Sequence, residues 1–180
     1  MLIDAHDSAL LVVDVQDKLV PAVAGWQTLL DHVVWLIRLA RRLEVPVLAC
    51  EQYPQGLGPT HPAVAAELPP GSIAGKIHFS AVAGACHGLD QSGGPGQYVV
   101  CGMETHVCVL QTVIELLAGG RPVFVVEEAV GSRREADKAL ALARMREAGA
   151  SIVSREMVAF EWLRRADSDV FREVSRNFLR

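Results

Sequence analysis

The chain has 180 residues, of which 51% are apolar and 21% charged, so it is long enough and apolar enough to bury a core. This composition excludes disorder as the main state. The net charge is −4, from 17 Lys plus Arg against 21 Asp plus Glu, and no basic run interrupts the sequence. A nucleic-acid-binding surface is therefore disfavoured.

Cysteine spacing and the amino terminus indicate the compartment. The four cysteines form no C-x-x-C pair, so they predict free thiols in a reducing compartment rather than zinc ligands or disulfides. Residues 1–8 are too polar for a secretory signal, and no apolar run approaches the roughly 18 residues of a spanning helix. We expect a cytoplasmic protein that binds neither membrane nor nucleic acid.

The first third of the chain predicts a strand, a helix and a second strand. Residues 9–13 form a continuous apolar run typical of a strand buried on both faces, and Asp14 follows it. Residues 26–43 have the three- and four-residue apolar spacing of an amphipathic helix. Residues 46–50 predict another strand, and the Pro- and Gly-rich residues 52–62 predict a long functional loop.

The middle of the chain is ambiguous. Residues 72–80 predict a strand around 73–79, and residues 81–89 are a small-residue segment that could be helical. The Gly-rich turn at 93–96 precedes the strand predicted at 98–101. A glycine cluster that cradles phosphate follows a strand and opens a helix, so this reversed order indicates no nucleotide site.

Strands and helices continue to alternate to the end of the chain. The sequence predicts a helix at 105–117, a strand at 122–126, a helix at 135–147, a strand at 151–153, and one or two helices from Met157 onward. No repeat or linker divides the chain, so we expect one domain over residues 1–180. The alternation predicts a three-layer αβα, Rossmann-like sandwich with a mostly parallel sheet of about six strands. Ligands bind such sheets at the carboxyl ends of strands, near the switch in strand order.

Two charged residues stand near predicted strand ends. Asp14 could cap a loop or pair with a lysine, or it could be a general base whose pKa is set by burial and a neighbouring cation. Lys76 lies in an apolar stretch, so it must either reach water or find a partner. If Lys76 faces the strand ends, it could hold Asp14 and a thiolate together.

The cysteines differ in position along the chain. Cys108 follows a strand and lies in the first turn of a helix, where backbone N–H groups favour a thiolate and lower the pKa from about 8.5. The patterns around Cys50, Cys86 and Cys101 indicate inert packing residues. The six histidines show no H-x-H or H-x-x-x-H spacing, so no metal site is indicated. His106 could partner the Cys108 thiol, but residues two apart on a helix point to different sides, so we interpret it as a pocket-lining residue.

Three motifs, in this order, resemble the isochorismatase-like, or cysteine-hydrolase, superfamily, which includes nicotinamidases and N-carbamoyl-amine hydrolases. They are LVVDVQ at 11–16, KIHFS at 76–80 and GMETHVCVLQT at 102–112, and the resemblance extends from about residue 8 to residue 160. The third motif is the most specific. The stretches EQYP at 51–54 and GLGPT at 56–60 resemble the branch of isochorismatase-domain proteins whose substrates are mostly unassigned.

The resemblance implies a catalytic triad of Asp14, Lys76 and Cys108. It also implies a cis peptide bond between Met103 and Glu104, and an oxyanion hole formed by the N–H groups of Glu104 and Cys108. We also expect the substrate pocket to be lined by Gln16, Leu19, Tyr53, Phe79 and His106. It implies homo-oligomers, dimers or larger, and the apolar face of the segment after Met157 fits self-association as well as cover for a core.

Two departures from the family pattern narrow the expected activity. Nicotinamidases of this superfamily carry an Asp-x-His metal-binding stretch where this chain has Glu51, Gln52 and Tyr53, so we expect no metal and no other cofactor. Isochorismatases proper lack the nucleophilic cysteine that Cys108 supplies. We therefore expect a cysteine-dependent hydrolase of a small amide, N-carbamoyl or related C–N compound, acting through a thioester.

Two other hypotheses remain. A catalytically silent, homo-oligomeric interaction protein could use the same fold, although a scaffold has no need of the complete triad. A peroxide-sensing thiol protein is disfavoured because no resolving cysteine lies close to Cys108 in the sequence.

Overall fold

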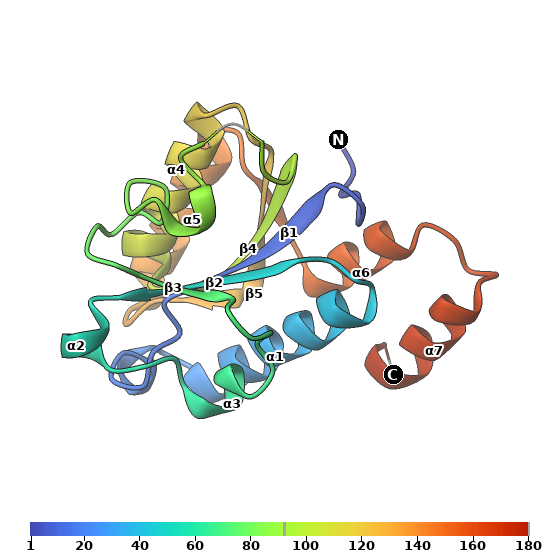
Figure 1. The fold of residues 1–180 in the computed structure, drawn as a ribbon, viewed down its shortest axis with the longest axis horizontal. Helices are drawn as coiled ribbons and strands as arrows, with labels where there is room; N and C mark the ends of the chain where they lie inside the picture. Colours follow the sequence, from blue (N-terminus) through green and yellow to red (C-terminus); the bar gives the residue numbers. More distant parts are fainter. Residues whose placement is uncertain (92, 180) are drawn as a thin grey trace.

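The protein is described by a computed structural model of residues 1–91 and 93–179. Its centre is a single six-stranded sheet, all parallel, in the order β3-β2-β1-β4-β5-β6 (Figure 1). The strands are β1 (Ser8–Val13), β2 (Val47–Gln52), β3 (Ile73–Lys76), β4 (Gln97–Met103), β5 (Val123–Gly131) and β6 (Ser151–Val153). The strand order reverses between β1 and β4.

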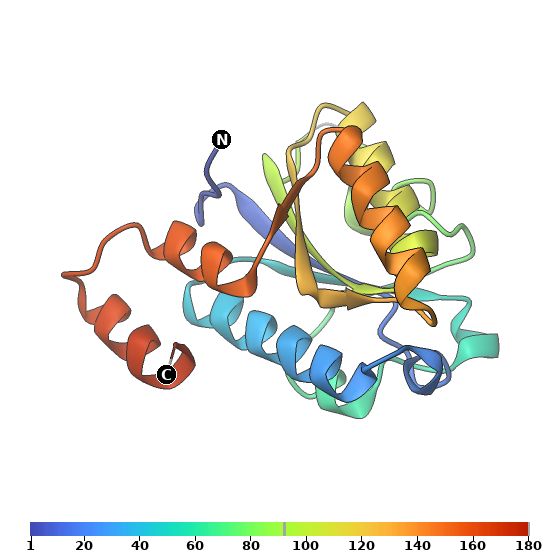
Figure 2. The ribbon, with the colours of Figure 1, turned by 180° about the vertical axis from the view of Figure 1, so that it is seen from behind.

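Helices cover both faces of the sheet, which confirms the predicted αβα sandwich. One face carries α1 (Trp26–Arg42), α3 (Pro62–Ala65), α6 (Arg155–Leu163) and α7 (Asp169–Phe178), and the other carries α4 (Leu110–Ala118) and α5 (Glu135–Glu147) (Figures 1 and 2). Shorter elements are η1 (Val20–Ala22), α2 (Pro54–Leu57), η2 (Cys86–Gly88) and η3 (Thr105–Val109), of which η3 is a π-helix.

The core is divided in two by the sheet because successive strand residues point to opposite faces. On β1, Leu10 and Val12 pack in the cluster with α1, whereas Leu11 and Val13 pack in the cluster with α4 and α5. All six residues of β1 are buried, as its uninterrupted apolar pattern predicts. Full burial of each such aliphatic side chain contributes roughly 1.5–3 kcal/mol to stability.

The middle of the chain differs from the prediction. The edge strand β3 ends at Lys76 rather than Phe79, because the chain turns back there and the Phe79 carbonyl accepts a hydrogen bond from the Lys76 ammonium. The segment predicted as a possible helix at 81–89 is mostly turns with a short η2, since Ala85 and His87 adopt positive φ angles that an α-helix excludes. The loop at 52–62 contains the short helix α2.

The carboxyl-terminal helix α7 packs on α1 of the same chain. Val174 is fully buried, the Phe178 ring lies edge-on to Trp35 with centroids 5.8 Å apart, and Arg42 pairs with Glu173. Much of the apolar face of this segment is therefore covered within the chain. None of the helices in the described residues has the length and apolarity needed to cross a membrane.

A close contact between β1 and β4 holds the centre of the sheet at its carboxyl edge. Gly102 has a φ of +119°, and a side chain there would overlap the backbone nitrogen and carbonyl oxygen of Val13. Only glycine permits this approach. This contact places Asp14, the residue that follows β1, beside the turn that follows β4.

We predict that Gly102→Ala lowers the free energy of unfolding by about 3 kcal/mol or more, because both the overlap and the φ angle oppose a methyl group. Urea denaturation measures the loss. Gly119→Ala is the matched control, since its φ is −78° and the nearest atom to its new methyl group is 3.4 Å away. Equal stability of the two variants would contradict the role of Gly102.

Candidate active site

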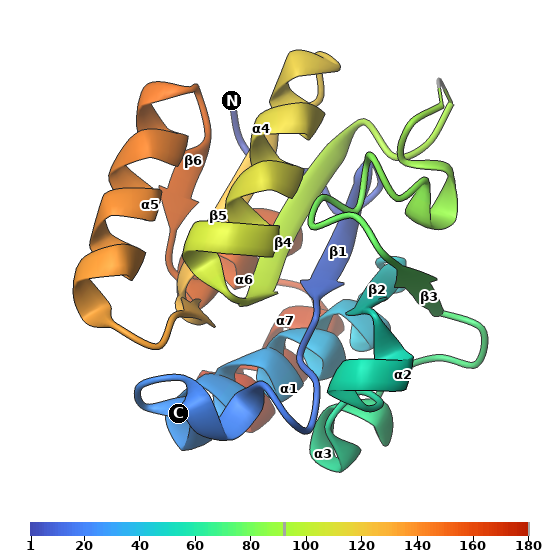
Figure 3. The ribbon, with the colours of Figure 1, turned by 90° about the vertical axis from the view of Figure 1, so that its left-hand side faces the viewer.

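The three residues of the expected triad come from three different segments and meet at one edge of the sheet. Asp14 directly follows β1, Lys76 is the last residue of β3, and Cys108 lies on η3 after β4. Figure 3 shows that β1 and β4 point to the same edge. This edge, at the reversal of strand order, is where the parallel-sheet rule places a ligand.

The chain has an unusual local conformation on both sides of this edge. Asp14 has a φ of +50°, which turns the chain sharply out of β1, and the Asp14 carbonyl accepts a 2.8 Å hydrogen bond from the Gln16 N–H. After β4, the peptide bond between Met103 and Glu104 is cis. The Glu104 carboxylate accepts hydrogen bonds from the Arg133 N–H, at 3.1 Å, and from Arg133 Nε, at 3.0 Å.

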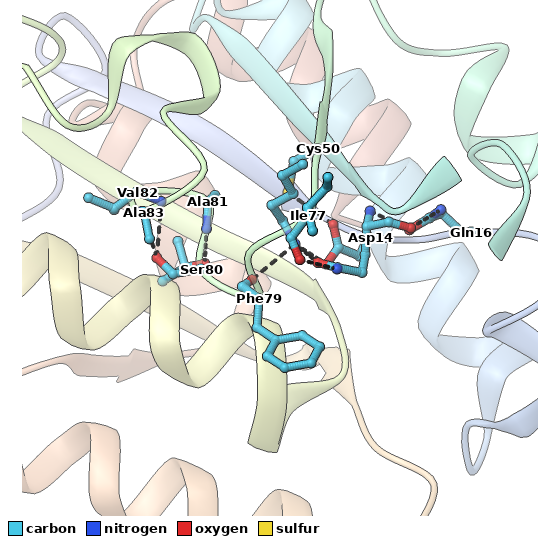
Figure 4. Close-up of polar contacts among 12 residues, drawn as sticks. Asp14, Gln16, Cys50, Ile77, Phe79, Ser80, Ala81, Val82 and Ala83 are labelled. Carbon is cyan, nitrogen blue, oxygen red and sulfur yellow. Dashed lines mark hydrogen bonds and ion pairs between the residues drawn. The ribbon is translucent and has the colours of Figure 1, made fainter. Parts of the chain in front are cut away.

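An ion pair with no solvent exposure forms the centre of the site. Lys76 Nζ lies 2.6 Å from Asp14 Oδ2, and both side chains are 0% exposed. The same ammonium donates to Gln52 Oε1 at 2.8 Å and to the Phe79 carbonyl at 2.9 Å. An ammonium has three protons, so each proton of Lys76 has an acceptor. Figure 4 shows Asp14 and the Phe79 carbonyl in this network, with the Phe79 ring turned away from it.

Burial and the ion pair act against each other on the two charges. Burial raises the pKa of Asp14 above its usual range, although the charge of Lys76 and hydrogen bonds from Lys76, Cys108 and Cys50 lower it. Burial alone would lower the pKa of Lys76, but the charge of Asp14, with smaller contributions from Cys50 and Cys108, leaves the pKa of Lys76 raised. Lys76 therefore stays an ammonium at neutral pH.

The thiol of Cys108 is protonated at rest, contrary to the expectation of a lowered pKa. Cys108 is only 5% exposed, and this burial, together with the neighbouring charge of Asp14, raises the pKa of its thiol more than Lys76 lowers it. The charges of Asp14 and Lys76 both act on the pKa of the Cys108 thiol, so the three groups lie close together. The arrangement is thus a neutral thiol near a buried base, rather than a stable thiolate.

Two further cysteines lie at the site, where the sequence patterns indicated inert packing. Cys50, on β2, donates from its sulfur to Asp14 Oδ1 at 3.1 Å. Cys86, on η2, belongs to the same buried cluster as Cys50 and Cys108, and a hydrogen bond with Cys50 is the main cause that lowers the pKa of Cys86. Cys101 packs on the opposite face of the sheet, where burial raises its pKa.

Gln52 is a site residue that the motifs did not single out for this role. Its Oε1 accepts from Lys76, and its Nε2 donates to the Ile77 carbonyl at 2.6 Å. The only sequence signal was its position at the carboxyl end of a strand. Gln16, expected in the substrate pocket, instead donates to the backbone carbonyls of Gln52 and Gly58 and accepts from the Gln52 N–H. The amide of Gln16 therefore fixes the loop after β2.

The other expected pocket residues surround the site unevenly. Tyr53 and Phe79 are each 52% exposed, and the Tyr53 ring covers Gly56. His106 Nδ1 is hydrogen-bonded to Ser132 Oγ at 2.9 Å. Leu19 is half-buried and packs on the α1 side of the core.

Glu51, at the position matching the first metal ligand of nicotinamidases, holds the loop instead. Its Oε1 accepts from the Thr60 N–H at 2.6 Å and from the Thr60 hydroxyl at 2.7 Å. Within residues 1–91 and 93–179, no three His, Cys, Asp or Glu side chains are gathered as ligands for a metal ion.

An open hollow of about 450 Å³ lies beside the site along the edge strand. It is lined by Pro54, Gln55, Gly75, Lys76, Ile77, His78, Ala83, Gly84 and Ala85. Lys76 is the one residue of the expected triad among these, so the hollow does not contain the Cys108 thiol.

The sequence model of the isochorismatase domain matches residues 8–157, which include every residue of this site. The chain belongs to the isochorismatase family. This agrees with the expected extent of the resemblance, from about residue 8 to residue 160.

Relatives within the isochorismatase family cover nearly the whole chain. Isochorismatase domain-containing protein 2A of Mus musculus is 36% identical over 172 residues, which are 95% of this chain and 82% of the relative. A structure of MAR1 ribonuclease from Caenorhabditis elegans has a TM-score of 0.91 at 33% identity, covering 100% of this chain and 93% of that one.

Two structures of YcaC proteins are also similar, each at 26% identity. The Escherichia coli structure, described as an octameric hydrolase of unknown specificity, has a TM-score of 0.90 and covers 99% of this chain and 91% of that one. The Pseudomonas aeruginosa structure, described with hexane-2,5-diol and covalent acrylamide, has a TM-score of 0.89 and covers 99% and 92%. The hydrolase fold of the isochorismatase family is therefore shared along the full chain.

We predict that Lys76→Met lowers the free energy of unfolding by about 3–5 kcal/mol at neutral pH, because it leaves the Asp14 carboxylate buried without its partner. The loss should shrink at acid pH. Without Lys76 the folded-state pKa of Asp14 rises further above 3.8, so the folded protein binds the proton more tightly and stability falls as pH rises through that window. Urea denaturation at about pH 5 and about pH 8 measures this slope.

Adding Asp14→Asn to Lys76→Met is the control, since it removes the titrating group. The double variant should recover stability at about pH 8 and lose the pH dependence. A loss of stability in Lys76→Met that is the same at both pH values would contradict the assigned pairing.

Proposed function

We propose that this isochorismatase-family protein is a cysteine-dependent hydrolase of a small amide, N-carbamoyl or related C–N substrate. The observation that carries the proposal is the fully buried Asp14–Lys76 ion pair, whose charges act on the pKa of the adjacent Cys108 thiol. A buried carboxylate held ionised beside a neutral thiol is the arrangement of a general base and a nucleophile.

In the first half-reaction Asp14 takes the thiol proton while the Cys108 sulfur bonds to the carbonyl carbon. Lys76 keeps Asp14 ionised and in place, because the three protons of the ammonium are already directed at fixed acceptors. The oxyanion accepts hydrogen bonds from the backbone N–H groups of Glu104 and Cys108. Loss of one such donor costs roughly 2.7–4 kcal/mol in other enzymes.

The first half-reaction ends with release of the amine. Protonated Asp14 gives its proton to the leaving amine as the C–N bond breaks, which leaves a thioester on Cys108. In the second half-reaction a water molecule enters, Asp14 takes its proton, and the hydroxide attacks the thioester carbonyl, which releases the acid as the C–S bond breaks. The thiol leaves with that proton, so both residues regain their starting states.

Burial limits the substrate to a small molecule. Cys108 is 5% exposed, and the Asp14 and Lys76 side chains have no exposure, so only a compact carbonyl group can reach the sulfur. Tyr53, Phe79 and His106 supply the side chains at the entrance in this proposal. Leu19 and Gln16 shape it indirectly, through the core and the loop.

The descriptions of similar proteins support a reactive thiol in this chain more strongly than they support cleavage of RNA. Acrylamide is an electrophile that thiolates attack, and the Pseudomonas aeruginosa YcaC structure is described with covalent acrylamide. The name of the Caenorhabditis elegans relative suggests a ribonuclease. A net charge of −4 and an inaccessible Lys76 do not suit a polyanionic substrate, so RNA is one control in the screen below.

We predict that Cys108→Ala lowers hydrolysis by about 1,000-fold or more, since the thioester cannot form. The assay is a screen of primary amides, N-carbamoyl compounds, ureides and RNA, with release of ammonia or amine as the readout for the first three. Intact-mass spectrometry in the presence of substrate should show an acyl adduct on the wild type and none on Cys108→Ala.

Cys101→Ala is the matched control, because Cys101 is a buried cysteine on the opposite face of the sheet. It should retain turnover and the adduct. Turnover that survives in Cys108→Ala, or that is lost equally in both variants, would refute the mechanism. Absence of turnover in the wild type would instead favour the silent interaction protein.

The proposal includes self-association, as in the Escherichia coli YcaC structure described as an octamer. Several apolar side chains near the site stay exposed in the single chain, among them Tyr53, Ile77 and Phe79. We expect light scattering after gel filtration to give a mass that is a multiple of the chain mass. A monomer at micromolar concentration would contradict this part.

A further inference from the structure

We propose that Cys50 is a positioning residue for Asp14, holding the carboxylate that receives the Cys108 proton. This inference rests on the proposed function and assigns to that site a residue outside the Asp14, Lys76 and Cys108 triad.

The geometry gives each oxygen of the Asp14 carboxylate its own donor. Lys76 Nζ binds Oδ2 at 2.6 Å from the β3 side, and the Cys50 sulfur binds Oδ1 at 3.1 Å from β2 (Figure 4). Two donors on opposite oxygens fix the rotation of the carboxylate about its terminal bond. In the proposed reaction, this fixed carboxylate is the group that receives the proton of Cys108.

The position of Cys50 on the sheet explains why its thiol can reach the Asp14 carboxylate. Cys50 pairs with Val13 in the register of β1 and β2, and the Asp14 N–H donates to the Cys50 carbonyl at 3.1 Å. Backbone and side chain of Cys50 therefore both contact Asp14. Cys50 is 1% exposed, so no water competes for the contact.

Cys50 acts as a donor because its thiol stays protonated. The neighbouring Cys86 thiol, burial and the charge of Asp14 all raise the pKa of Cys50. The titratable groups that face Asp14 are thus Lys76 from β3, Cys50 from β2, Cys108 from η3 and, through its charge, Cys86 from η2. Among them Lys76 and Cys50 stabilise the ionised carboxylate, and Cys108 is its proton donor in the reaction.

A comparison of Cys50→Ser with Cys50→Ala separates the effect of the hydrogen bond from the effect of side-chain packing. Serine keeps a donor of similar reach and alanine removes it, while both leave a smaller side chain than cysteine. Loss of the donor disfavours the ionised carboxylate, so Asp14 in Cys50→Ala should require a higher pH to act as a base.

The test uses iodoacetamide as the probe and needs no substrate. The rate at which Cys108 is alkylated is followed by peptide mass spectrometry between about pH 5 and about pH 8 in the wild type, Cys50→Ala and Cys50→Ser. For each protein, the alkylation rate at about pH 5 is divided by the rate at about pH 8. We expect this ratio to be about threefold lower in Cys50→Ala than in the wild type. Cys50→Ser should keep the wild-type profile.

Two results would overturn the inference. One is a Cys50→Ala profile that superimposes on the wild type, and the other is an equal shift in Cys50→Ser, which would assign the effect to packing. Circular dichroism at each pH confirms that the variants are folded. Cys101→Ala, which removes a buried cysteine far from Asp14, should leave the profile unchanged.

Asp14→Asn separates failure of this inference from failure of the proposed function. If Asp14 is the base, Asp14→Asn abolishes the acid limb of the wild-type profile whatever Cys50 does. An acid limb that persists in Asp14→Asn refutes the proposed mechanism itself, whereas a limb that depends on Asp14 but not on position 50 refutes only the role of Cys50.

Discussion

The buried ion pair between Asp14 and Lys76 is the constraint on which the site depends. Two charges with no solvent exposure are costly to desolvate, and such a pair is stable only when the remaining hydrogen-bonding groups are satisfied. The surroundings meet this condition. Gln52 and the Phe79 carbonyl take the other ammonium protons, and Cys50 binds the second carboxylate oxygen. Three features thus stabilise this one pair of charges. They are the early end of β3, the loop after β2 and a cysteine on β2.

The parallel sheet makes this assembly possible from short pieces of chain. Because neighbouring parallel strands end at the same edge, the last residues of β1, β2 and β3 and the turn after β4 converge without long excursions. The contact of Gly102 with Val13 then fixes the two central segments against each other. Asp14 and Lys76, which are 62 positions apart in the sequence, reach hydrogen-bonding distance through the register of these strands.

The sequence was sufficient where the signal is local. The apolar run of β1, the helical spacing of α1 and the alternation of elements predicted the sandwich, and the motifs around Asp14, Lys76 and Cys108 identified residues that meet in space. Contacts between strands were not predictable. Cys50 and Gln52 act on partners far away in sequence, and the raised pKa of Cys108 follows from burial, which exists only in the folded chain. The segment after β3 was misread because the Lys76 ammonium, rather than local propensity, turns it back.

The saturated ammonium of Lys76 also has a consequence for selectivity. Its three protons are committed to Asp14, Gln52 and Phe79, and the charge is balanced by the adjacent carboxylate. A negatively charged group arriving beside Cys108 would gain no hydrogen bond from Lys76 unless it displaced one of these acceptors. It would also meet the charge of Asp14 in a region of low dielectric. Under the proposed function, the site would therefore discriminate by charge, and we expect the reacting end of its ligand to be electrically neutral.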